Sequence, residues 1–152
     1  MLDVKESATM CRKLSGEVKM DAPYIAIQIV MMPRDTNPHG TIFGGVILSY
    51  IDMAGAIAAR REVVLRGGSP EAKIVTVALN RVEFKEAVLV GDVVRFETTV
   101  DRIGRTSITM HINVIAERLG VPIRVTDAEV VYVGVDAARH PIPLLPTKPI
   151  QP

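Results

Sequence analysis

The sequence has almost no cysteine and almost no net charge. Cys11 is the only cysteine among 152 residues, so no disulfide can form within the chain. No cluster of cysteine and histidine has the spacing of a zinc site, and we expect no metal. Eighteen Lys and Arg balance seventeen Asp and Glu, leaving a net charge of +1. So small a charge gives no strong field for nucleic acid or an anionic membrane, and we expect neither as a partner.

Long hydrophobic runs are also missing. Charges are spread through every apolar stretch of the first twenty residues, so no signal-peptide core is present there. The longest apolar run, residues 46–59, is interrupted by Ser49 and Asp52. It is shorter than the roughly 20 residues that a membrane-spanning helix needs. Together with the lone cysteine, these features predict a soluble cytoplasmic protein.

The composition that remains is that of one folded domain. Hydrophobic residues make up 48% and charged residues 23%, which is ordinary for a chain that folds unaided. A chain of this length buries a single core without metals or disulfides. We divide it into an N-terminal arm (1–22), a folded domain (23–136) and a proline-rich C-terminal tail (137–152). We expect the tail to lie extended on the surface, because its prolines cannot join the centre of a sheet or a helix.

The apolar pattern of the domain predicts one strand, one helix and then four strands. The helix carries Ala, Leu, Met and Ile on nearly every side, and at sixteen residues it is too long for an ordinary strand. The four later segments are rich in β-branched residues and are separated by short glycine turns, which implies antiparallel neighbours. The expected ranges are strand 24–32, helix 46–61, and strands 74–84, 92–102, 106–118 and 123–134.

This order predicts an α+β fold in which a curved antiparallel five-stranded sheet wraps around one long central helix. A helix that is apolar on all sides buries its perimeter only against the concave face of such a sheet. The sheet keeps open edges, and a second copy of the chain would seal both the edge and the helix. We therefore expect a homodimer.

Residues that could carry chemistry gather where a polar loop enters the helix. Gly44 and Gly45 allow a close approach of the backbone, and the amides at the helix start can polarise a carbonyl oxygen; alternatively, the two glycines only turn the chain. Asp52 sits two turns into an apolar helix. Such a carboxylate is either a base or nucleophile, or one half of a buried hydrogen bond or ion pair.

The loop before the helix holds further polar residues with ordinary explanations. Asp35 and Asn37 lie near proline and glycine, where such side chains usually bind local backbone amides. His39 could transfer protons, but a lone loop histidine is usually solvated, so we assign it no role.

These residues resemble a known family. The stretch MPRDTNPHGTIFGGVILSYIDMAGAIAAR looks like the opening of the cytosolic acyl-CoA thioesterases of the hot-dog superfamily. The segments IVTVALNRVEFKEAVLVGDVVRFETTV and GRTSITMHINV are also similar, so the resemblance runs from about Tyr24 to Val135. One departure lies in the segment 82–84, where close relatives often carry a small amide before Phe84 and this chain has an acid.

The resemblance implies a fold, a reaction and a set of site residues. It implies a hot-dog fold that hydrolyses acyl-CoA to free fatty acid and CoA at a homodimer interface, without a cofactor. Asp52 of one subunit would activate water or attack the thioester, opposite Asn37 and the Gly44 and Gly45 amides of the other. Dimers of similar proteins assemble further into tetramers or hexamers.

For the CoA end, the resemblance points to the turn formed by Gly104, Arg105, Thr106 and Ser107, whose backbone and cation suit a phosphate; the alternative is a plain hairpin turn. A non-catalytic acyl-CoA sensor of the same fold is the competing function. A dehydratase of this fold is a third reading, but it would need a histidine paired with a helix acid, and no such motif is present.

Overall fold

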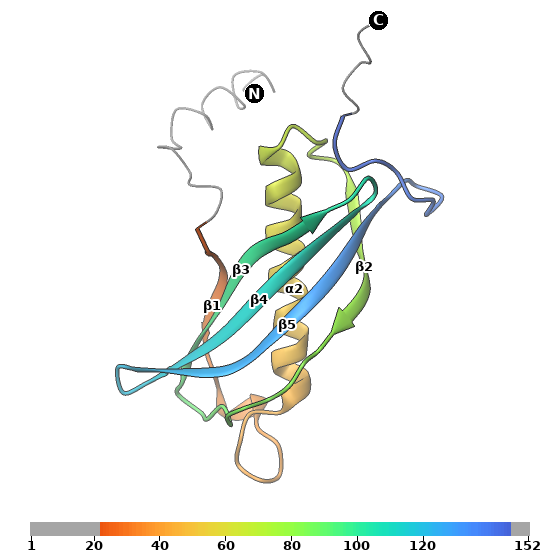
Figure 1. Cartoon of the computed structure of the whole chain (residues 1–152). Coiled ribbons are helices and arrows are strands. Elements are labelled where there is room, and N and C mark those ends of the chain that lie inside the picture. Colours follow the sequence, from red (N-terminus) through yellow and green to blue (C-terminus); the bar gives the residue numbers. More distant parts are fainter. Residues whose placement is uncertain (1–21, 147–152) are drawn as a thin grey trace, which may run out of the picture.

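The computed structural model describes residues 22–146, so most of the predicted arm, including Cys11, and the end of the tail lie outside the described residues. The chain forms five strands and one long helix (Figure 1). In order these are β1 (Tyr24–Val30), a short 3-10 turn η1 (Pro33–Asp35), α2 (Gly44–Leu65), β2 (Lys73–Asn80), β3 (Val93–Ile103), β4 (Ser107–Arg118) and β5 (Val121–Val135).

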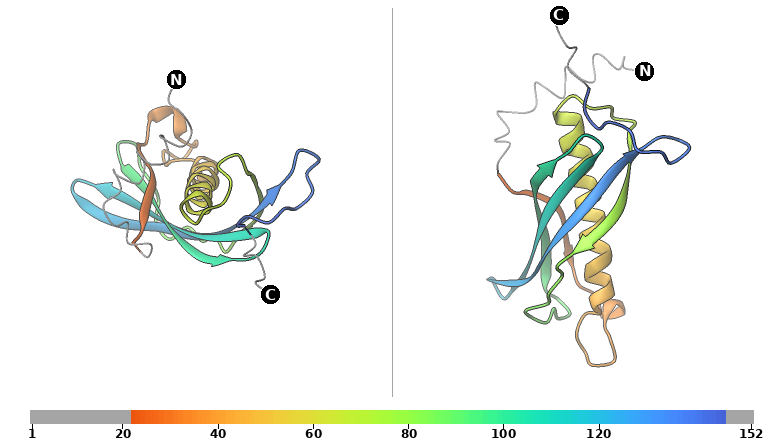
Figure 2. Two further views of the ribbon diagram at one scale, coloured as in Figure 1. Left: turned by 90° about the horizontal axis from the view of Figure 1, so that it is seen from above. Right: turned by 45° about the vertical axis from the view of Figure 1, so that its right-hand side comes forward.

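The five strands form one antiparallel sheet in the order β1-β3-β4-β5-β2. The strand that follows the helix, β2, pairs with β5 and becomes the edge opposite β1. The prediction that it neighbours the next strand, β3, is wrong, because β2 ends at Asn80 and residues 81–92 form a connection longer than a hairpin turn. Seen from above, the sheet curves around α2, which lies on its concave face (Figure 2). The predicted fold class, a curved five-stranded sheet around one helix, is confirmed.

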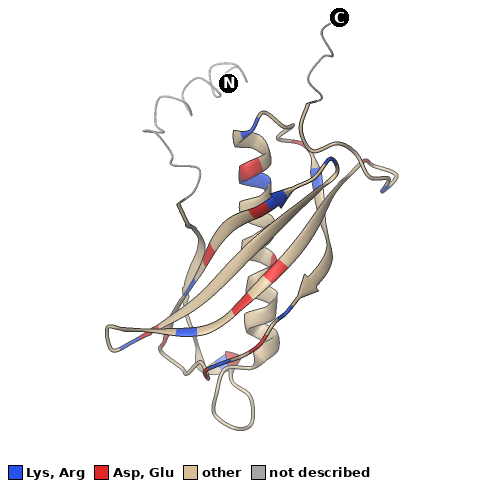
Figure 3. Ribbon diagram, viewed as in Figure 1, with Lys and Arg blue, Asp and Glu red and all other residues tan. Residues whose placement is uncertain are grey.

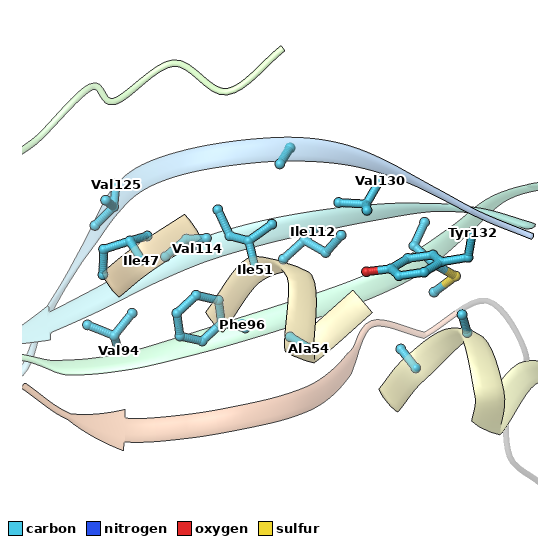
Figure 4. Close-up of a cluster of buried hydrophobic side chains, with 14 of the residues drawn as sticks. Ile47, Ile51, Ala54, Val94, Phe96, Ile112, Val114, Val125, Val130 and Tyr132 are labelled. Atoms are coloured by element: carbon cyan, nitrogen blue, oxygen red, sulfur yellow. The ribbon is translucent and has the colours of Figure 1, made fainter. Parts of the chain in front are cut away.

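The core lies between α2 and the central strands (Figure 4). Alternate side chains of β4 are at most 1% exposed, and they form the apolar face that the alternating pattern predicted. Small residues of α2, among them Ala54, Ala58 and Ala59, face the sheet and let the helix approach it closely. The buried β4 residues are Ile108, Met110, Ile112, Val114 and Ala116.

The helix is longer than predicted, and the sheet leaves part of it open. It runs from Gly44 to Leu65 instead of 46–61, because Glu62 and Val63 continue the buried face before the left-handed Gly67 (φ 88°) ends it. The sheet alone does not bury the whole perimeter, and the predicted second copy would have to seal the rest. Met53 is 50% exposed and Ile57 40%, so one apolar face of the helix stays open in the protomer.

The second strand and the C-terminal segment also differ from the prediction. The second strand ends at Asn80, not at residue 84, because Arg81 adopts a left-handed conformation (φ 50°) that interrupts extended backbone. The C-terminal segment does not lie wholly on the surface. Leu144 is 2% exposed, and its N–H donates to the Arg105 carbonyl at 3.0 Å. A β-carbon at Gly134 would lie 2.6 Å from the Leu144 side chain, so this glycine leaves the space that Leu144 fills.

Within residues 22–146, no helix is long and apolar enough to cross a membrane.

Candidate active site

The start of α2 presents backbone donors without a side-chain cap. Phe43 occupies the N-cap position, makes no capping hydrogen bond and is 58% exposed. The first amides of a helix have no acceptor within it, and they lie at the positive end of its dipole. A β-carbon on Gly45 would collide with the Phe43 ring, whereas one on Gly44 would meet Phe84 at an ordinary 3.6 Å. The amides of Gly44 and Gly45 thus lie at the helix start, and their binding of an oxyanion stays a prediction.

Asn37 organises the loop that leads to these amides. Its Oδ1 accepts the backbone N–H groups of His39 (2.9 Å) and Thr41 (3.2 Å), and its Nδ2 donates to the Thr41 hydroxyl (2.8 Å). Asp35 has a similar local role, because its Oδ2 accepts the Met32 N–H at 3.0 Å. Both residues therefore bind local backbone amides, which is the ordinary role that the sequence predicted for them. The amide of Asn37 has two N–H groups, so one donor remains beyond the bond to Thr41.

Asp52 lies on α2 where the helix faces β2. The hydroxyl of Thr76 donates to Asp52 Oδ1 at 2.6 Å, and the hydroxyl of Tyr132 donates to the Asp52 backbone carbonyl at 2.8 Å. No cation pairs with Asp52 among the described residues, so the buried ion pair considered for it is not found there. The carboxylate is half-buried and keeps a second oxygen for another partner.

Thr76 and Tyr132 were not anticipated from the sequence. They lie 24 and 80 residues from Asp52 along the chain. They meet it because β2 and β5 are neighbours, with Thr76 directly opposite Tyr132. A threonine and a tyrosine in β-branched segments look like ordinary strand residues. Only the register between two strands would have indicated them.

The turn of Gly104, Arg105, Thr106 and Ser107 joins β3 to β4. The Gly104 N–H donates to the Ser107 carbonyl at 2.8 Å, which is the hairpin turn weighed above. Arg105 is exposed and forms no ion pair within residues 22–146. The turn is thus a hairpin turn that also presents a guanidinium available for an anion, and its binding of CoA stays a prediction.

In one protomer these parts lie apart. Gly44 and Asp52 are eight residues apart on α2, which is about 12 Å along the axis at 1.5 Å per residue. The turn at Arg105 lies beside the opposite end of the helix from Gly44 (Figure 1). The fold thus brings Thr76 and Tyr132 to Asp52, and Asn37 to the loop before Gly44. It does not bring Asp52 to Gly44 and Gly45, nor to the turn.

A cavity of about 360 Å³ opens beside the helix start. Its wall includes apolar side chains and Gly44, together with Lys85 and Glu86. Phe84 belongs to this wall. Glu83, the acidic residue that departs from the family pattern, precedes it and is exposed, so it lies at the edge of the cavity. The apolar side chains of the wall are Ile42, Ile47, Phe84, Ala87 and Val88.

Two buried carboxylates, Asp92 and Glu62, belong to the scaffold. Asp92 is 2% exposed and accepts two bonds from Arg118, at 2.8 and 3.0 Å, and this guanidinium holds the pKa of Asp92 below its usual value. Glu62 pairs with Arg61 at 2.8 Å and with Arg66 at 3.4 Å. Across the fold as a whole, acidic and basic residues are interspersed along the helix and the strands, with no large region of one sign in this view (Figure 3). Residues 22–146 contain no group of three His, Cys, Asp or Glu residues suited to a metal ion.

Comparison with known proteins gives consistent results. Residues 39–123 match the family model of the thioesterase superfamily. An uncharacterized acyl-CoA thioester hydrolase of Buchnera aphidicola is 41% identical over 127 residues, covering 80% of this chain and 89% of that protein. The acyl-CoA thioester hydrolase YciA of Salmonella typhimurium is 35% identical, covering 79% and 89%.

Solved structures show the same similarity. A hexameric hotdog-fold thioesterase of Campylobacter jejuni is 44% identical with a TM-score of 0.69, covering 83% of this chain and 92% of that one. A hexameric thioesterase of Yersinia pestis is 35% identical with a TM-score of 0.73, covering 82% and 97%.

Proposed function

The chain belongs to the thioesterase superfamily and is an acyl-CoA thioester hydrolase, and we propose that it cleaves its substrate in an active site that two protomers share. The relatives are named as hydrolases, which favours catalysis over a non-catalytic acyl-CoA sensor. Asp52 supports the same choice, since a binder has no need of a carboxylate beside a reactive carbonyl.

The observation that supports a shared site is the distance along α2 between Gly44 and Asp52. A thioester carbonyl held by the Gly44 and Gly45 amides lies about 12 Å along the helix from Asp52 of the same protomer, which is beyond hydrogen-bond reach. A second helix lying antiparallel beside the first would bring its own Asp52 to these amides. By the two-fold symmetry of such a pair, two equivalent sites would form.

The surface available to that partner is apolar. Val75 and Val77 of the edge strand β2 are 41% and 56% exposed, and Met53 on α2 is 50% exposed. β2 also has one unpaired side, since it is the last strand of the sheet. Pairing of two β2 strands would continue the sheet across both protomers and cover the open face of each helix.

The proposed chemistry uses the carboxylate and the backbone donors. Asp52 takes a proton from water as the water oxygen attacks the thioester carbonyl, or it attacks the carbonyl itself and forms an anhydride that water then opens. The Gly44 and Gly45 amides hold the oxyanion, and Asn37 positions water or substrate. With water attack, the C–S bond then breaks, the CoA sulfur takes the proton that Asp52 accepted, and the free acid leaves. With direct attack, the C–S bond breaks as the anhydride forms; water then releases the acid and restores the carboxylate, and a proton of that water balances the one taken up by the CoA sulfur. Thr76 would orient Asp52 throughout.

The proposal also covers CoA binding and the assembly of the protein. Arg105 and the backbone of the turn Gly104–Ser107 would bind a phosphate of CoA. No cofactor is required, because CoA is part of the substrate. The hexamers formed by relatives support a homo-oligomer, and we propose that dimers of this chain assemble into hexamers in the cytoplasm.

The test is a thiol-release assay on a panel of acyl-CoA chain lengths. We expect the wild type to release CoA and Asp52→Asn to lower kcat about 100-fold or more, because the amide is neither a base nor a nucleophile. Asp101→Asn, which changes an exposed aspartate, is the matched control and should keep wild-type kcat. Absence of turnover on every chain length, with retained binding of acyl-CoA, would establish the sensor instead.

A further inference from the structure

The hydroxyl of Tyr132 makes an unusual contact inside the core. Tyr132 comes from β5 and is 0% exposed among the core side chains (Figure 4). Its hydroxyl nevertheless reaches the backbone carbonyl of Asp52 at 2.8 Å. In an α-helix that carbonyl already accepts the N–H group four residues later, that of Ala56. The helix turn therefore needs no further donor. The bond instead ties the backbone of Asp52 to the sheet.

Gly55 makes this contact possible. A β-carbon at residue 55 would collide with the Tyr132 hydroxyl oxygen and would lie 2.9 Å from Cζ of the ring. Glycine weakens a helix interior, where alanine is the best residue. Phenylalanine at position 132, with its ring shifted slightly, would leave room for alanine at position 55, which suits the helix better. Packing alone therefore does not account for the pair of Gly55 and the Tyr132 hydroxyl.

The sheet places a second contact next to the first. Thr76 on β2 lies directly opposite Tyr132 on β5. The Thr76 hydroxyl donates to the Asp52 carboxylate, while the Tyr132 hydroxyl donates to the carbonyl of the same residue. Asp52 is thus held at its side chain and at its backbone by one cross-strand pair.

We propose that Tyr132 is a positioning residue for the reaction, which fixes the height and rotation of the α2 turn so that the Asp52 carboxylate faces the scissile thioester, and that Gly55 provides the space it needs. This inference rests on the proposed function. Burial raises the pKa of Tyr132, and the nearby Asp52 charge adds to the effect. The hydroxyl therefore stays protonated, and remains a donor, at every pH at which the enzyme would be assayed.

The experiment compares four variants of the full chain: Tyr132→Phe, Gly55→Ala, the double variant of both, and Tyr24→Phe as a matched loss of a hydroxyl away from Asp52. Each is measured for kcat and KM on acyl-CoA and for Tm. We expect Tyr132→Phe to lower kcat roughly tenfold with little change in KM, because substrate still binds while the carboxylate is misplaced. Gly55→Ala should lower both Tm and kcat, and Tyr24→Phe should change neither.

The double variant separates positioning from packing. Removing the hydroxyl takes away the worst clash and the bond that holds the ring, so the ring can move away from the alanine methyl and Tm should recover toward the wild-type value. In contrast, kcat should stay near that of Tyr132→Phe. Recovery of kcat together with Tm would overturn the proposal, and so would wild-type kcat in Tyr132→Phe alone. A wild type that turns over no acyl-CoA would instead overturn the proposed function.

Discussion

Asp52 and Asp92 are both aspartates in apolar surroundings, and their partners give them different tasks. The side chain of Asp92 is 3% exposed, and its oxygens accept the Leu89 N–H and two bonds from Arg118. Its hydrogen-bonding capacity is thus used within the protomer, where it holds the β2–β3 connection against the end of β4. Asp52 accepts a side-chain bond only from Thr76 among the described residues, so it keeps capacity for a substrate.

The bonds between Asp92 and Arg118 predict how the free energy of unfolding depends on pH. Asp92→Asn should lower the free energy of unfolding at pH 7 by about 2 kcal/mol, because charge-assisted bonds to Arg118 are lost. The pKa of Asp92 is lowered in the folded protein, first by its hydrogen bond to Arg118. Its stabilisation is therefore complete above the unfolded pKa of about 3.9, and is lost as pH falls through the lower folded pKa.

Urea unfolding at pH 7 and at pH 3 measures this difference. The gap between wild type and Asp92→Asn should narrow at pH 3, while Asp101→Asn should match the wild type at both values. An equal gap at the two pH values would show that the charge of Asp92 contributes nothing.

For single residues, contacts between neighbours in the sequence were easier to predict than contacts between residues far apart in it. The loop bonds of Asn37 and Asp35 span two to four residues and follow from their neighbours. The singular position of Asp52 in an apolar helix was visible as well. Thr76 and Tyr132 were not, because their contact with Asp52 depends on which strands pair and in which register.

At the scale of elements, the C-terminal segment 141–146, here called the strap, packs over one end of the core. The Ile142 N–H donates to the Gly134 carbonyl at 2.8 Å, which leads the chain alongside β5. Leu144 then fills a space left by Gly134 and Gly68. Its N–H donates to the Arg105 carbonyl, so the strap also holds the turn that we assign to CoA.

Leu144→Ala should therefore destabilise the domain by about 3 kcal/mol, as expected for a cavity left by a buried leucine. Leu119→Ala is the matched control, because Leu119 is 99% exposed at the β4–β5 turn and should be neutral. Chemical denaturation of the two variants makes the comparison. Equal stability of Leu144→Ala and the wild type would show that the strap does not hold the core.

The elements themselves were largely predictable, and their lateral arrangement was not. Periodicity located the long helix and all five strands, and the inward face of β4 follows from its alternation. Prolines suggested a surface tail because they exclude regular structure, yet they do not prevent Leu144 between them from being buried. Nothing in the composition of β2 indicates that it crosses to the edge beside β5.

At the scale of the whole molecule, the protomer keeps apart two groups of residues that we propose form one site. One half is the uncapped helix start with its Asn37 loop; the other is Asp52 with Thr76 and Tyr132. The open part of α2 and the edge strand β2 both lie close to Asp52, because the exposed Met53 follows it on the helix and Thr76 of β2 bonds its carboxylate. A partner that covers these faces would therefore also complete the site, which couples assembly to activity.

Mixed dimers test this coupling directly. Asp52→Asn lacks the carboxylate, and Asn37→Asp keeps the loop acceptor but lacks the amide donor, so each variant alone should be inactive. When the two are unfolded and refolded together, half of the dimers are mixed, and each mixed dimer has one complete site. The mixture should regain about a quarter of wild-type kcat per protomer, because a two-fold interface combines Asp52 of one chain with Asn37 of the other. If native mass spectrometry detects mixed dimers and activity stays absent, each protomer must carry its own site, and the separation along α2 must be bridged in another way.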